Sequence, residues 1–301
     1  MVWQHLVSSW LKGYATDQVY RAAAEKVKAS AGEHSAADSQ EPPLVDVAVI
    51  ASNTAEAGEL TDRLSDAVTV HGDHFKVHLG LLHERRIALV EAGGNAAAAA
   101  QATTAVLAAH RPAWVIAAGF AISNSDEVKA CDVVLADALL DRSGHRLRID
   151  MHVDPESLKA NPRIHLGTVL SDSIETQGDM AAPKTQTASS ESPAALCSDI
   201  TSFAVAEACR KYKTPCLVVR VVTQTPADET SADIKHLHNQ STVAGKLGAA
   251  TGALWRRPSS IKDMWNDKER AILGAGRLAT YLAGMVAQLP ARDQDNRVDN
   301  E

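Results

Sequence analysis

The turn Gly93-Gly94-Asn95 has residue types that could act directly on a ligand. It follows an apolar run and precedes an alanine-rich stretch of helical composition. Glycines between a strand and a helix can present free backbone N–H groups to an anion or a ribose. The turn lacks the G-x-G-x-x-G spacing of dinucleotide sites, and no Walker lysine follows it, so nucleotide-cofactor motifs are missing. The other interpretation is a turn that only closes a βαβ unit.

A carboxylate, a histidine pair and four cysteines could also carry chemistry. Glu56 lies early in a predicted helix, where the helix dipole favours a carboxylate whether or not it acts on a substrate. His236 and His238 are two residues apart, a spacing that faces them apart on a helix and argues against a metal site. The cysteines form no C-x-x-C pair, and we interpret them as reduced and structural. We therefore predict neither a metal nor a cofactor.

Composition excludes several classes of protein. The chain has 37 acidic against 30 basic residues and a formal charge of −7, without a Lys/Arg block, so we expect no nucleic-acid partner. Polar residues interrupt the apolar positions of residues 1–30, which argues against a signal peptide or a transmembrane span. We expect a cytoplasmic location, although an amphipathic helix on a membrane surface would have the same pattern.

Alternating strands and helices must position these residues. Aromatic residues make up only 4% of the chain and alanine is abundant, which favours helices packed closely on a sheet. Apolar runs predict strands at 45–51, 86–91, 114–119, 132–139, 167–171 and 216–223, and helices at 55–64, 96–110, 199–212 and 267–289. Strand, glycine turn, helix and strand over residues 86–119 form a βαβ unit, which predicts parallel strands in one sheet.

We predict three parts of the chain. Residues 1–43 form a helical extension and a polar linker, residues 44–290 the main domain, and residues 291–301 a polar tail. Within the main domain, residues 178–193 have no periodicity and predict a surface loop, and residues 251–262 predict an irregular connection.

Several segments resemble a known family. They are Val49 to Glu56, Glu91 to Ala100, Trp114 to Ala121, Gly167 to Asp172, and Asp199 to Ala206 followed by Leu217 to Gln224. In order and pattern they resemble the nucleoside phosphorylase and nucleosidase superfamily, especially its methylthioadenosine/S-adenosylhomocysteine nucleosidase branch. The resemblance implies a three-layer α/β/α sandwich with a central mixed β-sheet, to which this chain adds the N-terminal helical extension.

The resemblance also implies a site for a purine nucleoside or thionucleoside. Glu56 stands where these nucleosidases activate the attacking water, and Ile174 where an apolar side chain covers the purine. The loop that binds ribose and phosphate corresponds to Ala92, Gly93, Gly94 and Asn95. The residues that line the ribose and base correspond to Asp199, Ile200, Thr201 and Thr223.

Two carboxylates of the family pattern are replaced. Thr201 stands where the family has a glutamate that holds the ribose hydroxyls, and Gln224 stands where an aspartate protonates the purine. Glutamine can donate a hydrogen bond but cannot transfer a proton, and general acid catalysis contributes about 10²–10⁴ in rate. Asp228, in the following loop, is either a replacement acid or a solvated surface charge.

These observations leave two functions open. One is a nucleosidase-like enzyme with weakened N-glycosidic cleavage, hydrolytic rather than phosphorolytic because the phosphate-binding arginines are missing. The other is a non-catalytic nucleoside-binding or scaffold protein, a pseudoenzyme. Trp3 and Trp10 could also dock the extension on a partner, and the resemblance implies a homo-oligomer.

Overall fold

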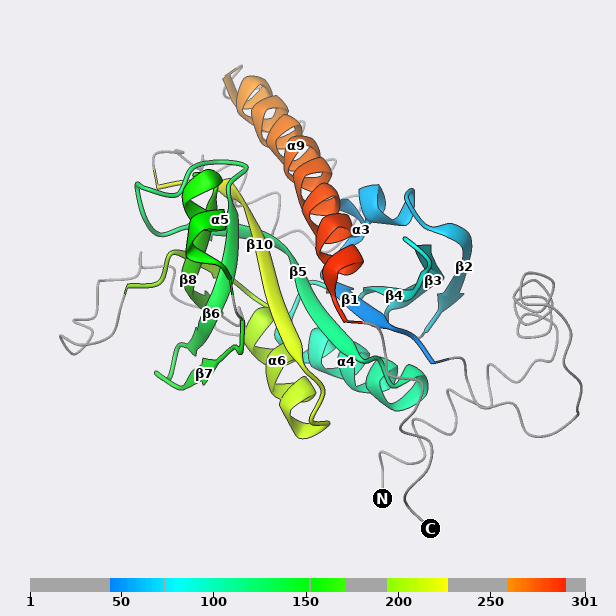
Figure 1. Cartoon of the computed structure of the whole chain (residues 1–301). Helices are drawn as coiled ribbons and strands as arrows, with labels where there is room; N and C mark the ends of the chain where they lie inside the picture. Colours follow the sequence, from blue (N-terminus) through cyan, green and yellow to red (C-terminus); the bar gives the residue numbers. More distant parts are fainter. Residues whose placement is uncertain (1–43, 73, 152, 172–193, 227–258, 291–301) are drawn as a thin grey trace, which may run out of the picture. The chain divides into compact units, whose positions relative to one another are not determined.

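The computed structural model describes residues 44–72, 74–151, 153–171, 194–226 and 259–290 (Figure 1). These residues form two compact units. Unit 1 contains the described residues within Met1–Ala117, Ala204–Leu217 and Tyr281–Glu301, and unit 2 contains those within Ala118–Phe203 and Val218–Thr280. Strands β5 (Trp114–Ser123) and β10 (Cys216–Gln224) and helices α6 (Ser202–Lys211) and α9 (Ser259–Gln288) contribute residues to both units.

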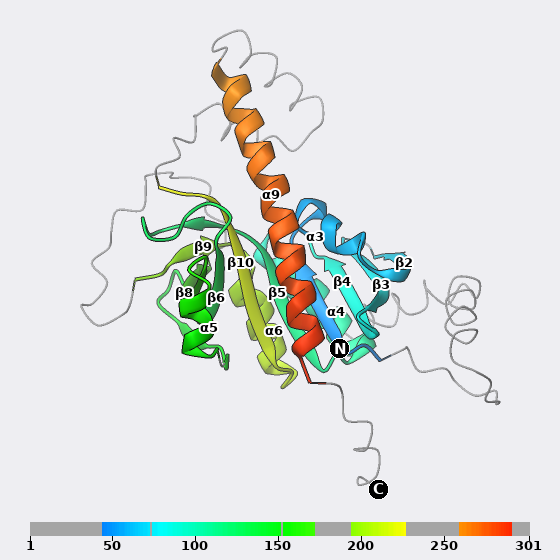
Figure 2. The same cartoon turned by 45° about the horizontal axis from the view of Figure 1, so that its top comes forward.

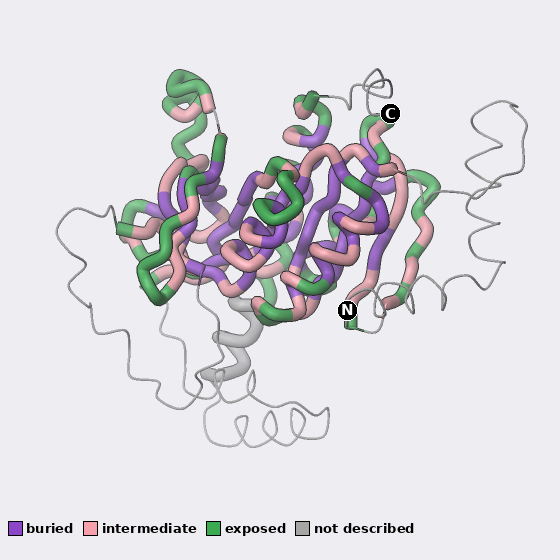
Figure 3. The backbone as a smooth tube through the Cα atoms, turned by 90° about the horizontal axis from the view of Figure 1, so that it is seen from below, coloured by how far each residue is buried: buried purple, intermediate pink, exposed green. Residues whose placement is uncertain are grey.

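Unit 1 contains the predicted βαβ unit. Strand β1 (Val47–Ala51) lies between β4 (Arg85–Glu91) and β5 and is parallel to both. Strands β3 (Lys76–Leu82) and β2 (Ser65–His71) extend the sheet beyond β4 in antiparallel order. All of β1 and the last five residues of β4 are buried (buried residues are purple in Figure 3). The predicted parallel strands are therefore confirmed.

Helices cover both faces of this part of the sheet. Helices α3 (Thr54–Thr61) and α4 (Ala96–His110) lie on opposite faces of β1 and β4 (Figures 1 and 2). Asparagine side chains cap both helices, Asn53 at the start of α3 and Asn95 at the start of α4. The small side chains of α4 allow close packing, and Ala99 and Ala102 are fully buried. Unit 1 thus has three layers.

Unit 2 contains the mixed part of the sheet. Strand β6 (Val133–Asp141) is parallel to β8 (Ile164–Ser171) and antiparallel to β10 and to β7 (Arg146–Arg148). Strand β9 (Cys197–Asp199) is parallel to β8 and antiparallel to β5. Helix α5 (Pro155–Ala160) precedes β8. The predicted α/β fold with a mixed sheet is confirmed.

The structure corrects three sequence predictions. Strands β2 and β3 lie at Ser65–His71 and Lys76–Leu82, where we predicted no strand. The prediction missed them because β2 is largely exposed and its register shifts between Ser65 and Val68. Asp199 ends β9 instead of starting a helix, and α6 begins at Ser202. Helix α9 begins at Ser259, inside the predicted irregular connection, because proline is tolerated before a helix and Pro258 does not interrupt it.

Several predicted features lie outside the described residues. They are the extension 1–43, the loop 178–193, the tail 291–301, and the candidate residues Ile174 and Asp228. The division of the chain into three parts therefore stays a prediction. Across the described ranges, no helix has both the length and the apolarity needed to cross a membrane. All four cysteines are free thiols.

Candidate functional site

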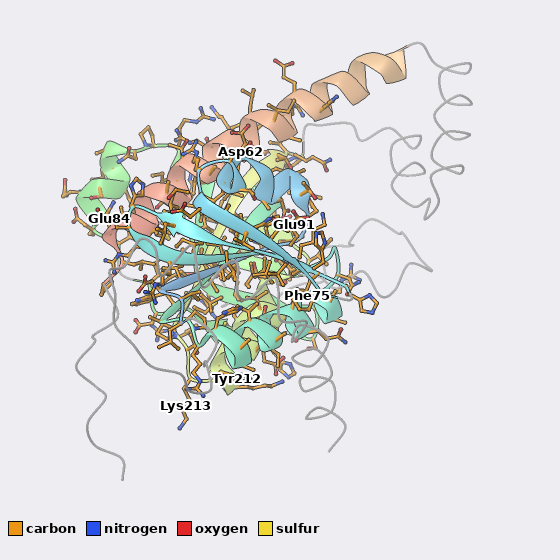
Figure 4. All side chains as sticks on the ribbon, turned by 90° about the vertical axis from the view of Figure 1, so that its right-hand side faces the viewer. Asp62, Phe75, Glu84, Glu91, Tyr212 and Lys213 are labelled. Atoms are coloured by element: carbon orange, nitrogen blue, oxygen red, sulfur yellow. The ribbon has the colours of Figure 1, made fainter. Side chains whose placement is uncertain are left out.

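A pocket of about 530 Å³ lies in unit 1, at the carboxyl ends of the parallel strands β1 and β4. Ligands of open α/β sheets bind outside this edge. The pocket is lined by the loops after the two strands and by the end of the β2–β3 hairpin: Ser52, Asn53, Thr54, His71, Gly72, His74, Phe75, Lys76, Glu91, Gly93 and Gly94. Figure 4 shows Glu91 and Phe75 near the end of these strands opposite Glu84.

The Glu56 carboxylate is buried beside the loop that lines this pocket. Its side chain Oε2 accepts a hydrogen bond from the Ser52 backbone N–H at 2.6 Å, and the residue is 6% exposed. Asn53 caps α3 by accepting hydrogen bonds from the backbone N–H groups of Ala55, at 2.9 Å, and Glu56, at 3.2 Å. The first turn of α3 thus holds the Glu56 side chain in a fixed position within the protein rather than in solvent.

One backbone N–H group of the glycine turn already donates a hydrogen bond within the protein. The Gly93 N–H donates to the Ser52 carbonyl at 3.0 Å, so it is not offered to a ligand as the sequence suggested. Gly93 has φ +93°, a conformation that L residues rarely adopt, whereas a Cβ on Gly94 would point into open space. Asn95 accepts from the Ala98 N–H at 2.8 Å and caps α4. Gly93 and Gly94 line the pocket, and Ala92 is 1% exposed.

Glu91 is a residue of this pocket for which we predicted no role from the sequence. It ends β4, lines the pocket and is 9% exposed. Thr54 Oγ1 donates to Glu91 Oε2 at 2.7 Å, Lys76 Nζ donates to the same oxygen at 3.2 Å, and His78 Nε2 lies 2.9 Å from Oε1. Burial raises the pKa of Glu91, but these hydrogen bonds outweigh burial and hold the pKa below its ordinary value.

A second cluster lies in unit 2 around the start of α6. Arg220, on β10, is 1% exposed and forms an ion pair with Asp199. Its guanidinium also donates to Ser202 Oγ at 2.7 and 2.9 Å and to Thr201 Oγ1 at 3.1 Å. Asp199 Oδ2 accepts from the N–H groups of Thr201, at 3.1 Å, and Ser202, at 2.8 Å. This network therefore links Asp199 and Thr201, two of the residues that we predicted to line a ligand site.

The remaining predicted residues of unit 2 lie at the ends of strands. Thr223 and Gln224 are the last residues of β10 and are partly exposed, and Ile200 follows β9 and is also partly exposed. Gly274 of α9 packs on Thr223, where a Cβ would lie 3.1 Å from Thr223 Cγ2. Among the described residues, no group of three or more His, Cys, Asp and Glu side chains is placed to hold a metal ion.

Comparison with known proteins gives relatives for this fold. The model of the phosphorylase superfamily matches residues 46–184. A 5′-methylthioadenosine/S-adenosylhomocysteine nucleosidase of Staphylococcus haemolyticus is 24% identical over 198 residues, which are 59% of this chain and 85% of that protein.

Solved nucleosidases share the fold. The enzyme of Neisseria meningitidis in complex with methylthio-immucillin-A is 19% identical, with a TM-score of 0.57 over 82% of this chain and 100% of that one. The Helicobacter pylori enzyme with butyl-thio-DADMe-Immucillin-A is 16% identical, with a TM-score of 0.60 over 82% and 99%. Residues 46–184 are thus similar in sequence to the phosphorylase superfamily, and the chain has the fold of solved methylthioadenosine/S-adenosylhomocysteine nucleosidases.

Proposed function

We propose that this chain binds a purine nucleoside or thionucleoside and cleaves its N-glycosidic bond, with a rate weakened by the loss of two carboxylates. The observation that carries the proposal is the buried Glu56 carboxylate, held by the Ser52 N–H beside the pocket at the ends of β1 and β4. A family relationship to nucleosidases supports the ligand class.

Glu56 acts in this proposal as the base that activates water. Hydrolysis of an N-glycosidic bond needs a water molecule oriented toward the sugar, and a carboxylate fixed by a short hydrogen bond can orient and deprotonate it. The 2.6 Å contact with Ser52 fixes Oε2, and the capped first turn of α3 fixes the backbone that carries the side chain. This arrangement favours hydrolysis over phosphorolysis.

Two substitutions weaken the proposed cleavage. Thr201 carries no charge, and its hydroxyl oxygen already accepts a hydrogen bond from the buried Arg220. Gln224 cannot protonate a departing purine, and loss of a general acid lowers a rate by about 10²–10⁴. Purine nucleosides should therefore be bound better than they are cleaved.

The second candidate is a non-catalytic nucleoside-binding or scaffold protein. The neutral Gln224 at the end of β10 favours it, because the leaving base then lacks a proton donor. Both candidates share the ligand class and differ only in turnover. The proposal also includes Asp228 as a displaced acid and Ile174 as the side chain that covers the purine. It further includes a cytoplasmic location and a homo-oligomer.

A thermal-shift and calorimetric screen of the full chain tests the binding. The probes are adenosine, inosine, 5′-methylthioadenosine, S-adenosylhomocysteine and adenine. A ligand at 100 times its Kd raises the free energy of unfolding by about 2.7 kcal/mol. We expect a shift with at least one nucleoside, and no shift with any probe would overturn the proposal.

A matched pair of variants locates the site. Gly94→Leu places a side chain into open space at the pocket and should abolish the shift. Gly58→Leu places the same side chain into open space on α3, away from the pocket lining, and should keep the shift. Equal ligand responses in both variants would place the ligand elsewhere.

A further inference from the structure

Glu91 combines burial, fixed geometry and access to the pocket. Its three hydrogen-bond partners come from two other elements: Thr54 from α3, and Lys76 and His78 from β3. The Glu91 side chain is 10% exposed, whereas that of Lys76 is 43% exposed. The carboxylate is therefore anchored from within the protein and borders the pocket with its remaining surface.

The donors are divided unequally between the two carboxylate oxygens. Oε2 accepts hydrogen bonds from Thr54 and Lys76. Within the described part of the chain, the only hydrogen-bond partner of Oε1 is His78. An ionised carboxylate offers about four acceptor positions on its two oxygens. Oε1 thus retains one position for a donor of a bound molecule.

Thr69 and His78 fix the orientation of this acceptor. An ionised carboxylate can only accept, so His78 Nε2 carries a hydrogen and donates to Glu91 Oε1. The Nδ1 atom of His78 lies 2.8 Å from Thr69 Oγ1, which holds the ring from its other side. The chain Thr69–His78–Glu91 therefore sets the direction of Oε1 before a ligand arrives.

The surrounding groups suit a sugar. Ser52, Asn53 and Thr54 bring hydroxyl and amide groups that both donate and accept, and Gly93 and Gly94 let a ligand approach the backbone closely. Phe75 adds an aromatic side chain to the same lining. A carboxylate among such groups can accept short, charge-assisted hydrogen bonds from hydroxyl groups.

We propose that Glu91 binds a sugar hydroxyl of the ligand through Oε1 and thereby determines specificity for ribosides. This inference rests on the proposed function, because it assigns the pocket of unit 1 to the nucleoside. It gives this chain a hydroxyl-binding carboxylate, which the neutral Thr201 cannot supply. Lys76 competes for the same carboxylate, and Thr69 and His78 act as positioning residues.

The test compares two probes, adenosine and 2′,3′-dideoxyadenosine, by calorimetric titration of the full chain. The quantity of interest is the ratio of the two dissociation constants. Wild type should prefer adenosine by roughly 10- to 100-fold, the range expected for a hydrogen bond to a charged group. In Glu91→Gln the ratio should fall toward one through weaker adenosine binding, while dideoxyadenosine binding is retained. A ratio unchanged by Glu91→Gln would overturn the inference.

Lys76→Met provides an independent variant that keeps Glu91 in place. Removing the half-exposed ammonium leaves the negative charge of Glu91 less neutralised, so Oε1 should accept a hydrogen bond from a sugar hydroxyl more strongly and the preference for adenosine should rise. An unchanged or lower ratio would overturn the inference even if Glu91→Gln did not fold. Wild type that binds neither probe and none of the nucleosides of the screen above would contradict the proposed function, whereas equal binding of both probes would contradict only the role of Glu91.

Discussion

Replacing Arg220 by Met should strongly destabilise unit 2. The guanidinium is 1% exposed and its partner Asp199 has a side chain that is 2% exposed, so the variant leaves a buried carboxylate without its cation. Breaking a buried ion pair costs about 3–5 kcal/mol. Asp199 keeps the N–H groups of Thr201 and Ser202, which favours the lower end, about 3 kcal/mol.

Chemical denaturation followed by circular dichroism measures this loss. Arg210→Met is the matched control, because Arg210 is an exposed residue of α6 and surface substitutions change stability by about 0.5 kcal/mol or less. The double variant Asp199→Asn with Arg220→Met removes both charges and should be more stable than Arg220→Met alone. If Arg220→Met cost no more than Arg210→Met, the buried network would not stabilise the start of α6 as argued.

Three further predictions concern stability. Gly93→Ala should cost about 1–2 kcal/mol in urea denaturation because of its positive φ, and Gly94→Ala should cost much less; similar losses would refute the backbone argument. Glu91 has a lowered pKa, so its contribution is present above the unfolded-state value of 4.5 and is lost as pH falls through the folded-state value. Between about pH 5 and pH 3, Glu91→Gln should therefore lose less stability than wild type, and an equal loss would contradict this assignment. Asp132→Asn weakens the contacts of a buried carboxylate with Arg163, at 2.9 Å, and His165, at 3.1 Å, and should lower the unfolding free energy by about 1–3 kcal/mol. An unchanged denaturation midpoint would show that the link between β6 and β8 is dispensable.

The sequence predicted the central elements because their signals are local. Strand β1 is a continuous apolar run, and α4 is an alanine-rich stretch between Asn95 and Arg111, which has φ +42° at the helix end. The β2–β3 hairpin was missed because the bulge between Ser65 and Val68 breaks the alternation of exposed and buried residues. Strand β9 has only three residues, too few to show a period.

The candidate site was predictable only in part, for a related reason. Glu56 could be proposed from the sequence because its position after β1 is a local pattern that resembles the nucleosidase family. The role of Glu91 had no such signal, since its partners Thr54, Lys76 and His78 lie 37, 15 and 13 residues away in the chain. The hydrogen bond from the Gly93 N–H to the Ser52 carbonyl likewise joins the loops after two neighbouring strands, and no spacing in the sequence reveals it.

Adenine release from adenosine by Gln224→Asp tests the central claim most directly. The variant restores a carboxyl group at the end of β10, with Gln224→Asn as a control that cannot transfer a proton. We predict that wild type binds adenosine but releases adenine slowly, that Gln224→Asp raises the rate by up to about 10²–10⁴, and that adding Glu56→Gln abolishes the gain. Rapid release by wild type that is insensitive to Glu56→Gln, or no gain in Gln224→Asp, would contradict the account.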